Sequence, residues 1–496
     1  MLIPAGAHRS SIVPARSAAG RPRLAPIVLA AMVSAAVVCG ARAHAQAQSQ
    51  APGAEIDAIF APWDQPDSPG CALGLVRDGE LVYERGYGSA NLDWRIPIGT
   101  DTVFYVGSVS KQFTAAAIAL LALDGGISLD DDIRTYFPEM PAYQRPITVR
   151  HLVHHTSGLR DIYTLMALAG IRLEDVFTDE QAIALIAAQR ETNFPPGDEY
   201  LYSNSGYFLL AQLVERVSGK PLRQYAEERI FAPLGMSDTH FHDRPEHVVE
   251  RRAMSYQGNA EDGFRLSYLG NFDKVGAGGL YSTVRDLLLW DRNFFTGDVG
   301  GEALLELIQT TGILDGGDPI TYAFGLTIDA YRGARTVSHS GSMMGFKAAF
   351  LQFPEQRFSV LVTCNLGPIE PMGLAYRVAD IELGEQLEPV APESRPGGSG
   401  EAAEQPEAEP FTAAELAAYA GEYYSAELGV TYRLSEEDGE LRLSLRNTPP
   451  RRLRKAGGEV RVGGWRLSFD GDAAGAVSGF TVDAGRVTNI RFVRRP

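Results

Sequence analysis

The stretch YVGSVSKQFTAAAIALLALDGG, residues 105–126, decides the fold, because it places a serine and a lysine three residues apart ahead of an alanine-rich run. The run predicts a buried helix that ends at the glycine pair. A spacing of three puts Ser108 and Lys111 on one helix face, with Ser108 at the amino end, where free N–H groups favour a developing anion. A buried lysine is costly unless its charge is paired or its proton is given up. Either Ser108 caps the helix and Lys111 is exposed, or Lys111 activates the serine hydroxyl.

Several segments around this stretch carry secondary-structure patterns. Residues 71–90, CALGLVRDGELVYERGYGSA, predict a hairpin around Asp78-Gly79. Residues 128 to about 270 are predicted to form mostly helices and loops, and another helix is predicted after the glycine cluster at 276–279. Within 336–364, GFKAAFLQF and RFSVLVTCN predict two adjacent strands. The chain therefore mixes helices and strands.

The composition divides the chain into four parts. The first 45 residues hold five arginines, no acidic residue and an apolar run over 27–39, which predicts a signal peptide cleaved after Ala45. We expect a catalytic domain over 46–387. Residues 388–410 are rich in Pro, Gly and Glu and predict a linker. Residues 411–496 alternate with period two and predict a small all-β, barrel-like domain.

The predicted leader and the net charge indicate where the protein is located and which partners it does not bind. A cleaved leader implies a periplasmic or secreted protein. The chain has 62 acidic and 45 basic residues, a formal net charge of -17, and the leader holds only basic ones. So acidic a protein is a poor partner for nucleic acid or anionic membranes. No second long apolar segment occurs, so we expect no stable membrane insertion after cleavage.

Two further motifs follow the serine and lysine in order: Tyr202-Ser203-Asn204 and His339-Ser340-Gly341. With S-x-x-K they match the three motifs of the serine β-lactamase and penicillin-binding protein superfamily, which the chain resembles over roughly residues 55–385. ITVRHLVHHTSGL, FPPGDEYLYSNSGY, GAGGLYSTVRDLLLW and FKAAFLQFP are similar to the class C β-lactamase-related branch. The resemblance implies an α/β fold: an antiparallel sheet flanked by helices, with a helical subdomain.

The resemblance also implies roles for individual residues. Ser108 is the nucleophile that becomes acylated, and Lys111 lowers its proton affinity. Tyr202 is the general base or proton shuttle, with a pKa pulled below about 10 by the lysine. Asn204 binds the substrate amide or Lys111. The backbone N–H groups of Ser108 and Ser342 form the oxyanion hole.

The third motif implies a preference among substrates. His339, Ser340 and Gly341 are expected to bind substrate, but His339 stands where many relatives have lysine, and histidine is mostly neutral at pH 7. The H-x-G form is similar to that of D-aminopeptidases and esterase relatives. We therefore expect a serine hydrolase that cleaves D-amino-acid peptide, ester or lactam acyl donors, with peptidase or esterase activity above β-lactamase activity. The alternative is a penicillin-recognising binder or sensor that is acylated without fast turnover.

A metal hydrolase built on His151, His154 and His155 is a rival interpretation, since residues three and four apart share a helix face. H-E-x-x-H is absent, however, and the resemblance implies a structural turn there. An α/β-hydrolase is excluded because no G-x-S-x-G occurs. We expect no metal and no cofactor, and a small-molecule or peptide substrate; the sequence leaves the oligomeric state open.

The implied fold bears on Cys71 and Cys364, which remain after the leader is removed. In that fold the first strand lies antiparallel beside the last, so the two cysteines would come close. A disulfide requires both side chains on one face, and a slip of one residue separates them. We therefore favour two separately buried thiols over a disulfide.

Overall fold

The computed structural model describes residues 51–267, 270–389, 408–471 and 476–496. The predicted leader, residues 1–45, and most of the predicted linker, residues 390–407, lie outside the described residues. Among the residues described, no helix is long and apolar enough to cross a membrane.

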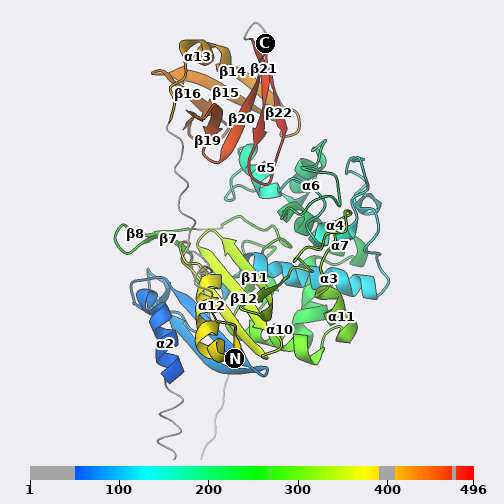
Figure 1. Ribbon diagram of the computed structural model, residues 1–496, viewed down its shortest axis with the longest axis vertical. Coiled ribbons are helices and arrows are strands. Elements are labelled where there is room, and N and C mark those ends of the chain that lie inside the picture. Colours follow the sequence, from blue (N-terminus) through cyan, green and yellow to red (C-terminus); the bar gives the residue numbers. More distant parts are fainter. Residues whose placement is uncertain (1–50, 268–269, 390–407, 472–475) are drawn as a thin grey trace, which may run out of the picture. The chain divides into compact units, whose positions relative to one another are not determined.

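A six-stranded antiparallel sheet forms the centre of the catalytic domain (Figure 1). Its order is β10-β11-β12-β13-β1-β2, so the first strands of the chain lie beside the last strand of the sheet. The hairpin at Asp78-Gly79 and the two late strands are confirmed. The strands are β1 Cys71–Arg77, β2 Glu80–Tyr87, β10 Thr327–Tyr331, β11 Ala334–Met343, β12 Phe346–Phe353 and β13 Phe358–Cys364.

Helices cover both faces of this sheet, which explains why its central strands β12 and β13 are buried almost throughout. On one face pack α2 (Ala51–Phe60) and α12 (Pro371–Leu383), the latter yellow in Figure 1. On the other face α10 (Val284–Thr296) connects the sheet with the helical region. The fold is therefore the predicted α/β arrangement with a flanked antiparallel sheet.

Helix α3 (Ser110–Leu123) lies at the centre of the helical region. Every residue from Ser110 to Leu121 is buried, so neighbouring elements cover this helix on all sides. It ends where the sequence predicts, because the Gly126 N–H donates to the Leu121 carbonyl (2.9 Å) while Gly125 takes a positive φ of 76°. A 3₁₀ turn over Gly107–Val109 precedes it and carries Ser108.

Short elements surround α3 and complete the catalytic domain. The helices are α4 Val149–Val153, α5 Ile162–Leu168, α6 Asp179–Ala187, α7 Asn204–Ser218, α8 Leu222–Ala226, α9 Ala232–Leu234 and α11 Gly301–Ile308. The strands are β3 Ser89–Asn91, β4 Ile96–Pro97, β5 Phe104–Tyr105, β6 His240–Phe241, β7 Tyr256–Asn259, β8 Gly263–Leu266 and β9 Leu280–Ser282.

The C-terminal region, orange to red in Figure 1, is the predicted all-β, barrel-like domain, called the β domain below. It holds α13 (Ala413–Tyr419) and one nine-stranded antiparallel sheet of order β17-β16-β15-β14-β22-β21-β20-β19-β18. Leu165 and Leu168 of α5 share its apolar core, and the Tyr432 hydroxyl donates to the Leu168 carbonyl (2.6 Å). The strands are β14 Gly421–Ser425, β15 Val430–Glu437, β16 Glu440–Ser444, β17 Arg451–Arg452, β18 Arg454–Ala456, β19 Glu459–Val462, β20 Trp465–Gly471, β21 Val477–Asp483 and β22 Ile490–Arg494.

The structure corrects the preference for two free thiols. Cys71 and Cys364 form a disulfide, with Cα atoms 4.0 Å apart. The register pairs them directly across β1 and β13, so both side chains leave the same face of the sheet. The register between the two strands depends on the whole sheet, and the sequence alone does not specify it.

Removing this disulfide should lower the free energy of unfolding by up to about 5 kcal/mol, because the bond closes a loop of 293 residues. The variant is Cys71→Ala/Cys364→Ala, which avoids placing hydroxyl groups in an apolar core. Urea denaturation with and without a thiol reductant measures the effect. Reductant should lower the midpoint of the parent chain and leave that of the double variant unchanged. A parent chain with two free thiols in denaturant, besides Cys39 if the leader is present, would contradict the bond.

Candidate active site

Ser108 and Lys111 lie together at the start of α3, as their spacing predicts. The Lys111 side chain is completely buried, and its Nζ is 3.3 Å from the Ser108 Oγ. Nζ also lies 2.9 Å from the Asn204 Oδ1 and 2.6 Å from the carbonyl oxygen of Ala277. The interpretation of Lys111 as an exposed residue is therefore wrong.

Burial lowers the pKa of Lys111 well below its ordinary value of 10.5. The negative charge of Asp161 opposes this shift, and the positive charge of Arg486 adds to it. A neutral amine has two N–H groups and one lone pair. The oxygens of Asn204 and Ala277 can only accept, so they take the two N–H groups and leave the lone pair toward the Ser108 hydroxyl. Lys111 is thus placed to take the proton of Ser108.

Asp161 fixes the orientation of Asn204. Its Oδ2 accepts from both the backbone N–H and the side-chain Nδ2 of Asn204, each at 2.8 Å. The side-chain oxygen of Asn204 must then face Lys111. Asn204 is the first residue of α7, so this carboxylate also takes one of the N–H groups that a helix start leaves unpaired. Asp161 is a positioning residue that sequence reasoning missed, although it directly follows the HTSGLR run.

The structure corrects the expected state of Tyr202. Burial raises the pKa of its phenol above the ordinary value of 10, and the nearby Ser108 hydroxyl and Arg486 guanidinium offset only part of this effect. The hydroxyl is buried and has no hydrogen-bond partner among the described residues. Lys111 does lie over the ring, with Nζ 4.7 Å from its centroid. The raised pKa favours the protonated phenol at neutral pH, so Tyr202 is better suited to donate a proton than to act as the base.

Two glycines let β11 approach the turn that carries Ser108. A Cβ on Gly107, which has a φ of 56°, would lie 2.5 Å from the backbone nitrogen of Ser342. A Cβ on Gly341 would lie 1.9 Å from the carbonyl oxygen of Val106. Only glycine permits such contact between backbones. The backbone nitrogens of Ser108 and Ser342 both lie at this contact, since a Cβ on Gly341 would also be 3.2 Å from the Ser108 nitrogen. The predicted oxyanion hole requires two such N–H groups close together.

The third motif places a neutral histidine at the cavity. Burial and the neighbouring Lys111 lower the pKa of His339 to about 3, against the effect of its hydrogen bond to Ser340. The Nδ1 lies 2.6 Å from the Ser340 carbonyl oxygen, which only accepts, so the proton is on Nδ1. The Nε2 then accepts from the Tyr322 hydroxyl at 3.0 Å. Both ring nitrogens are thus engaged within the protein, and His339 supplies no positive charge.

These residues surround a cavity of about 880 Å³, the catalytic cavity. Of the residues predicted to bind substrate, His339 and Ser340 line it, whereas Gly341 lies against the backbone of residues 106–108. Trp465 and Arg486 of the β domain line it as well. The sequence did not suggest that the β domain reaches the catalytic residues, because they are separated by the linker.

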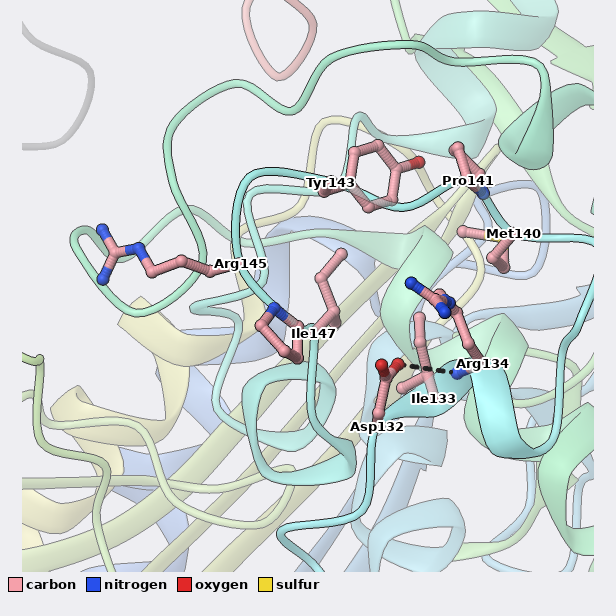
Figure 2. Close-up of a pocket in the computed structure, with 9 residues that line it drawn as sticks. Asp132, Ile133, Arg134, Met140, Pro141, Tyr143, Arg145 and Ile147 are labelled. Atoms are coloured by element: carbon pink, nitrogen blue, oxygen red, sulfur yellow. Dashed lines mark hydrogen bonds between the residues drawn. The ribbon is translucent and has the colours of Figure 1, made fainter.

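A second, smaller cavity of about 60 Å³ lies in the loop region after α3 and is shown in Figure 2. The Asp132 side chain in it accepts from the backbone N–H of Arg134 (2.9 Å), the dashed line in the figure. The Arg145 guanidinium pairs with Asp198 and Asp315. The nine lining residues include no serine, threonine, cysteine, histidine or lysine.

The three histidines proposed for a metal site take structural positions. His151 completes the amino-terminal cap of α4 with Thr148. The His154 Nδ1 lies 3.2 Å from the Tyr322 carbonyl oxygen, and the His155 Nδ1 accepts from the Ser203 N–H at 3.1 Å. In the part of the chain that the structure describes, no group of three His, Cys, Asp or Glu residues could hold a metal ion.

Residues 56–383 match the profile of the beta-lactamase family. A D-aminopeptidase of Cereibacter sphaeroides is 28% identical over 405 residues, which is 81% of this chain and 72% of that protein.

Two solved structures show a similar fold. The octameric penicillin-binding protein homologue from Pyrococcus abyssi aligns with a TM-score of 0.61 and 23% identity, over 89% of this chain and 99% of that chain. The D-amino acid amidase from Ochrobactrum anthropi SV3, solved with L-phenylalanine amide, aligns with a TM-score of 0.55 and 26% identity, over 66% of this chain and 99% of that chain.

Proposed function

The chain belongs to the beta-lactamase family and is a β-lactamase-related serine hydrolase, and we propose that it is an exported enzyme that forms an acyl-enzyme on Ser108. The observation that carries the proposal is the environment of Lys111, whose lone pair can face only the Ser108 hydroxyl. Such an amine activates a serine without a separate histidine.

The names of the relatives support a substrate class. The relative from Cereibacter sphaeroides is a D-aminopeptidase, and the structural neighbour from Ochrobactrum anthropi SV3 is a D-amino acid amidase. We assign to this chain the hydrolysis of amides, peptides or esters of D-amino-acid derivatives. The names of these relatives also support the ranking of β-lactams below these substrates. The neutral His339 means only that a substrate carboxylate meets no cation at the third motif itself.

Acylation begins when the Ser108 proton passes to the Lys111 amine. The freed Oγ attacks the substrate carbonyl carbon, and the carbonyl π electrons move to its oxygen. That oxyanion lies against the backbone N–H groups of Ser108 and Ser342. When the C–N or C–O bond of the leaving group breaks, the Tyr202 hydroxyl supplies the proton and is reprotonated from the Lys111 ammonium.

Deacylation repeats these roles with water. Lys111 takes a proton from water, and the hydroxide oxygen attacks the acyl carbon. The bond from that carbon to the Ser108 Oγ then breaks, the acid product leaves, and the Oγ regains a proton from the Lys111 ammonium. Asn204 takes part by holding Lys111 and by presenting its amide at the cavity, where Asp161 fixes its orientation.

Export is supported by the disulfide. Such bonds persist in oxidising compartments, so the Cys71–Cys364 pair fits a periplasmic or secreted protein. We propose that the mature chain begins after Ala45. Intact-mass measurement of the secreted protein should then show a chain that starts at Gln46 and is lighter by two hydrogen atoms than its reduced form.

Exposure to D-phenylalanine p-nitroanilide, D-phenylalanine methyl ester and benzylpenicillin tests the activity. We expect continuing release of p-nitroaniline and of methanol, and slow turnover of penicillin. Peptide mapping after rapid quenching should place the acyl mass on the peptide that contains Ser108. A single burst equal to the enzyme concentration would instead favour a sensor that is acylated without turnover, and acyl mass on another residue would overturn the assignment of Ser108.

A further inference from the structure

The β domain contributes a positive charge to the catalytic cavity. Arg486 lies in the turn between β21 and β22 and lines the cavity together with Ser108. Its guanidinium carbon is 4.7 Å from the centroid of the Tyr202 ring, a distance at which a cation is attracted to the ring face. Arginine stays protonated in proteins, whereas His339 is neutral. Among the described residues that line the cavity, Arg486 is therefore the one fixed cation.

The backbone of this turn is fastened to the catalytic domain. The carbonyl oxygen of Arg486 accepts from the backbone N–H of Asp161 (3.3 Å) and from the side-chain amide of Asn193 (2.9 Å). The backbone N–H of Thr488 donates to the Asn193 Oδ1 at 2.9 Å. These bonds fix the backbone of Arg486 and Thr488 against the catalytic domain, so the guanidinium starts from a fixed point beside Tyr202.

The guanidinium forms a long ion pair with Asp161 but donates no hydrogen bond to it. Its nearest acidic group is the Asp161 carboxylate, with Nη1 3.9 Å from Oδ2, beyond hydrogen-bond distance. That Oδ2 already accepts twice from Asn204. The Arg486 side chain is 46% exposed and makes no hydrogen bond to another residue within the described ranges. The planar fork of arginine matches both oxygens of a carboxylate.

We propose that Arg486 binds a carboxylate of the substrate, so that the enzyme prefers acyl donors that carry a carboxylate to donors whose single charge is an α-ammonium. The inference rests on the proposed function and specifies its substrate class. The cation that the third motif lacks is supplied by another domain, and it repels an ammonium group placed beside it.

Matched substrates test this preference. N-succinyl-, N-acetyl- and unblocked D-phenylalanine p-nitroanilide differ in charge on the acyl side, and N-acetyl-D-alanyl-D-alanine and its amide differ on the leaving side. In Arg486→Gln, the kcat/KM ratio of the carboxylate to the neutral member should fall about ten-fold or more in at least one pair, since a charge-assisted bond is lost. The ratio of the unblocked to the N-acetyl anilide should rise. Arg486→Lys should restore part of the preference.

Arg491→Gln is the matched control, because Arg491 lies on the exposed side of β22 and does not line the catalytic cavity. It removes the same charge from the same domain and should leave every ratio unchanged. If Arg491→Gln changes the ratios as Arg486→Gln does, or if neither variant changes them, the inference is overturned.

Binding without turnover separates this inference from the proposed function. In Ser108→Ala, calorimetry should show tighter binding of N-succinyl- than of N-acetyl-D-phenylalanine amide, and adding Arg486→Gln should abolish the difference. If the parent chain hydrolyses no substrate but this pattern holds, the proposed function fails and the inference stands. Equal binding of both amides in Ser108→Ala, together with equal binding of N-acetyl-D-alanyl-D-alanine and its amide, overturns the inference even if hydrolysis is observed.

Discussion

Ser108→Ala should lower turnover by about 10⁴-fold or more and abolish labelling by a fluorophosphonate or penicillin probe. The reason is geometric: the Ser108 Oγ is the hydroxyl that lies 3.3 Å from the Lys111 Nζ, beside the backbone nitrogens that would hold the oxyanion. Residual activity should come from the oxyanion hole and substrate positioning alone. Steady-state kinetics and gel fluorescence after labelling measure both effects.

The control for this variant is Ser128→Ala. Ser128 is exposed in the loop beyond α3, where its hydroxyl accepts from the Asp130 N–H at 3.2 Å. Its loss should leave kinetics and labelling as they are in the parent chain. Probe labelling that persists in Ser108→Ala would show that a different residue is the nucleophile, and the acyl-enzyme assignment would be wrong.

Replacing Lys111 should reduce kcat nearly as much as replacing Ser108, because the two groups act as a unit and their losses do not add. Lys111→Met removes the amine and keeps the length of the side chain. Lys111→Arg keeps a positive charge but cannot give up its proton. We expect both variants to be inactive by comparison with the parent chain, and circular dichroism should confirm that they are folded.

The pH profile gives a second test of the same role. A protonated Lys111 has no lone pair, so kcat/KM should rise with pH and level off once Lys111 is neutral. Burial places this midpoint well below 10.5. Since the pKa of Tyr202 is raised, loss of its proton should not cause a decline below about pH 10. Substantial activity in Lys111→Arg, or a rate that falls with rising pH in the neutral range, would show that Lys111 contributes charge and is not the base.

Local signals in the sequence predicted much of the fold. The Asp78-Gly79 pair specified a hairpin, and Gly125-Gly126 specified the end of α3, because turns and helix ends depend on residues close in the chain. The disulfide was missed because the pairing of β1 with β13 is set by contacts over the whole sheet. A shift of one residue would have pointed the cysteines to opposite faces.

In the candidate site, too, some features were predicted from the sequence and others were missed. Ser108, Lys111, Tyr202 and Asn204 are brought together as the motifs imply, and their catalytic roles remain predictions. The prediction of a lowered pKa for Tyr202 was wrong. The motif indicates that a charged lysine lies nearby, but it does not reveal the burial of the phenol, which has the larger effect on the pKa. Asp161 and Arg486 were missed for different reasons. Asp161 closely follows a stretch that carries the resemblance but belongs to none of the three motifs. Arg486 reaches the site because the β domain packs on α5.

The contact between Gly107 and Gly341 makes the position of the predicted oxyanion hole independent of the side chains that form the cavity walls. The atoms that would receive the oxyanion are held by main chain against main chain, with no rotatable side chain between them. Their spacing is therefore as stiff as the sheet and the turn themselves, and side-chain rotamer changes nearby leave it unaffected. The walls of the cavity, by contrast, are built from side chains of two domains. As related enzymes diverge, substitutions in the cavity walls can therefore admit new acyl donors while the substrate carbonyl group is held in the same place.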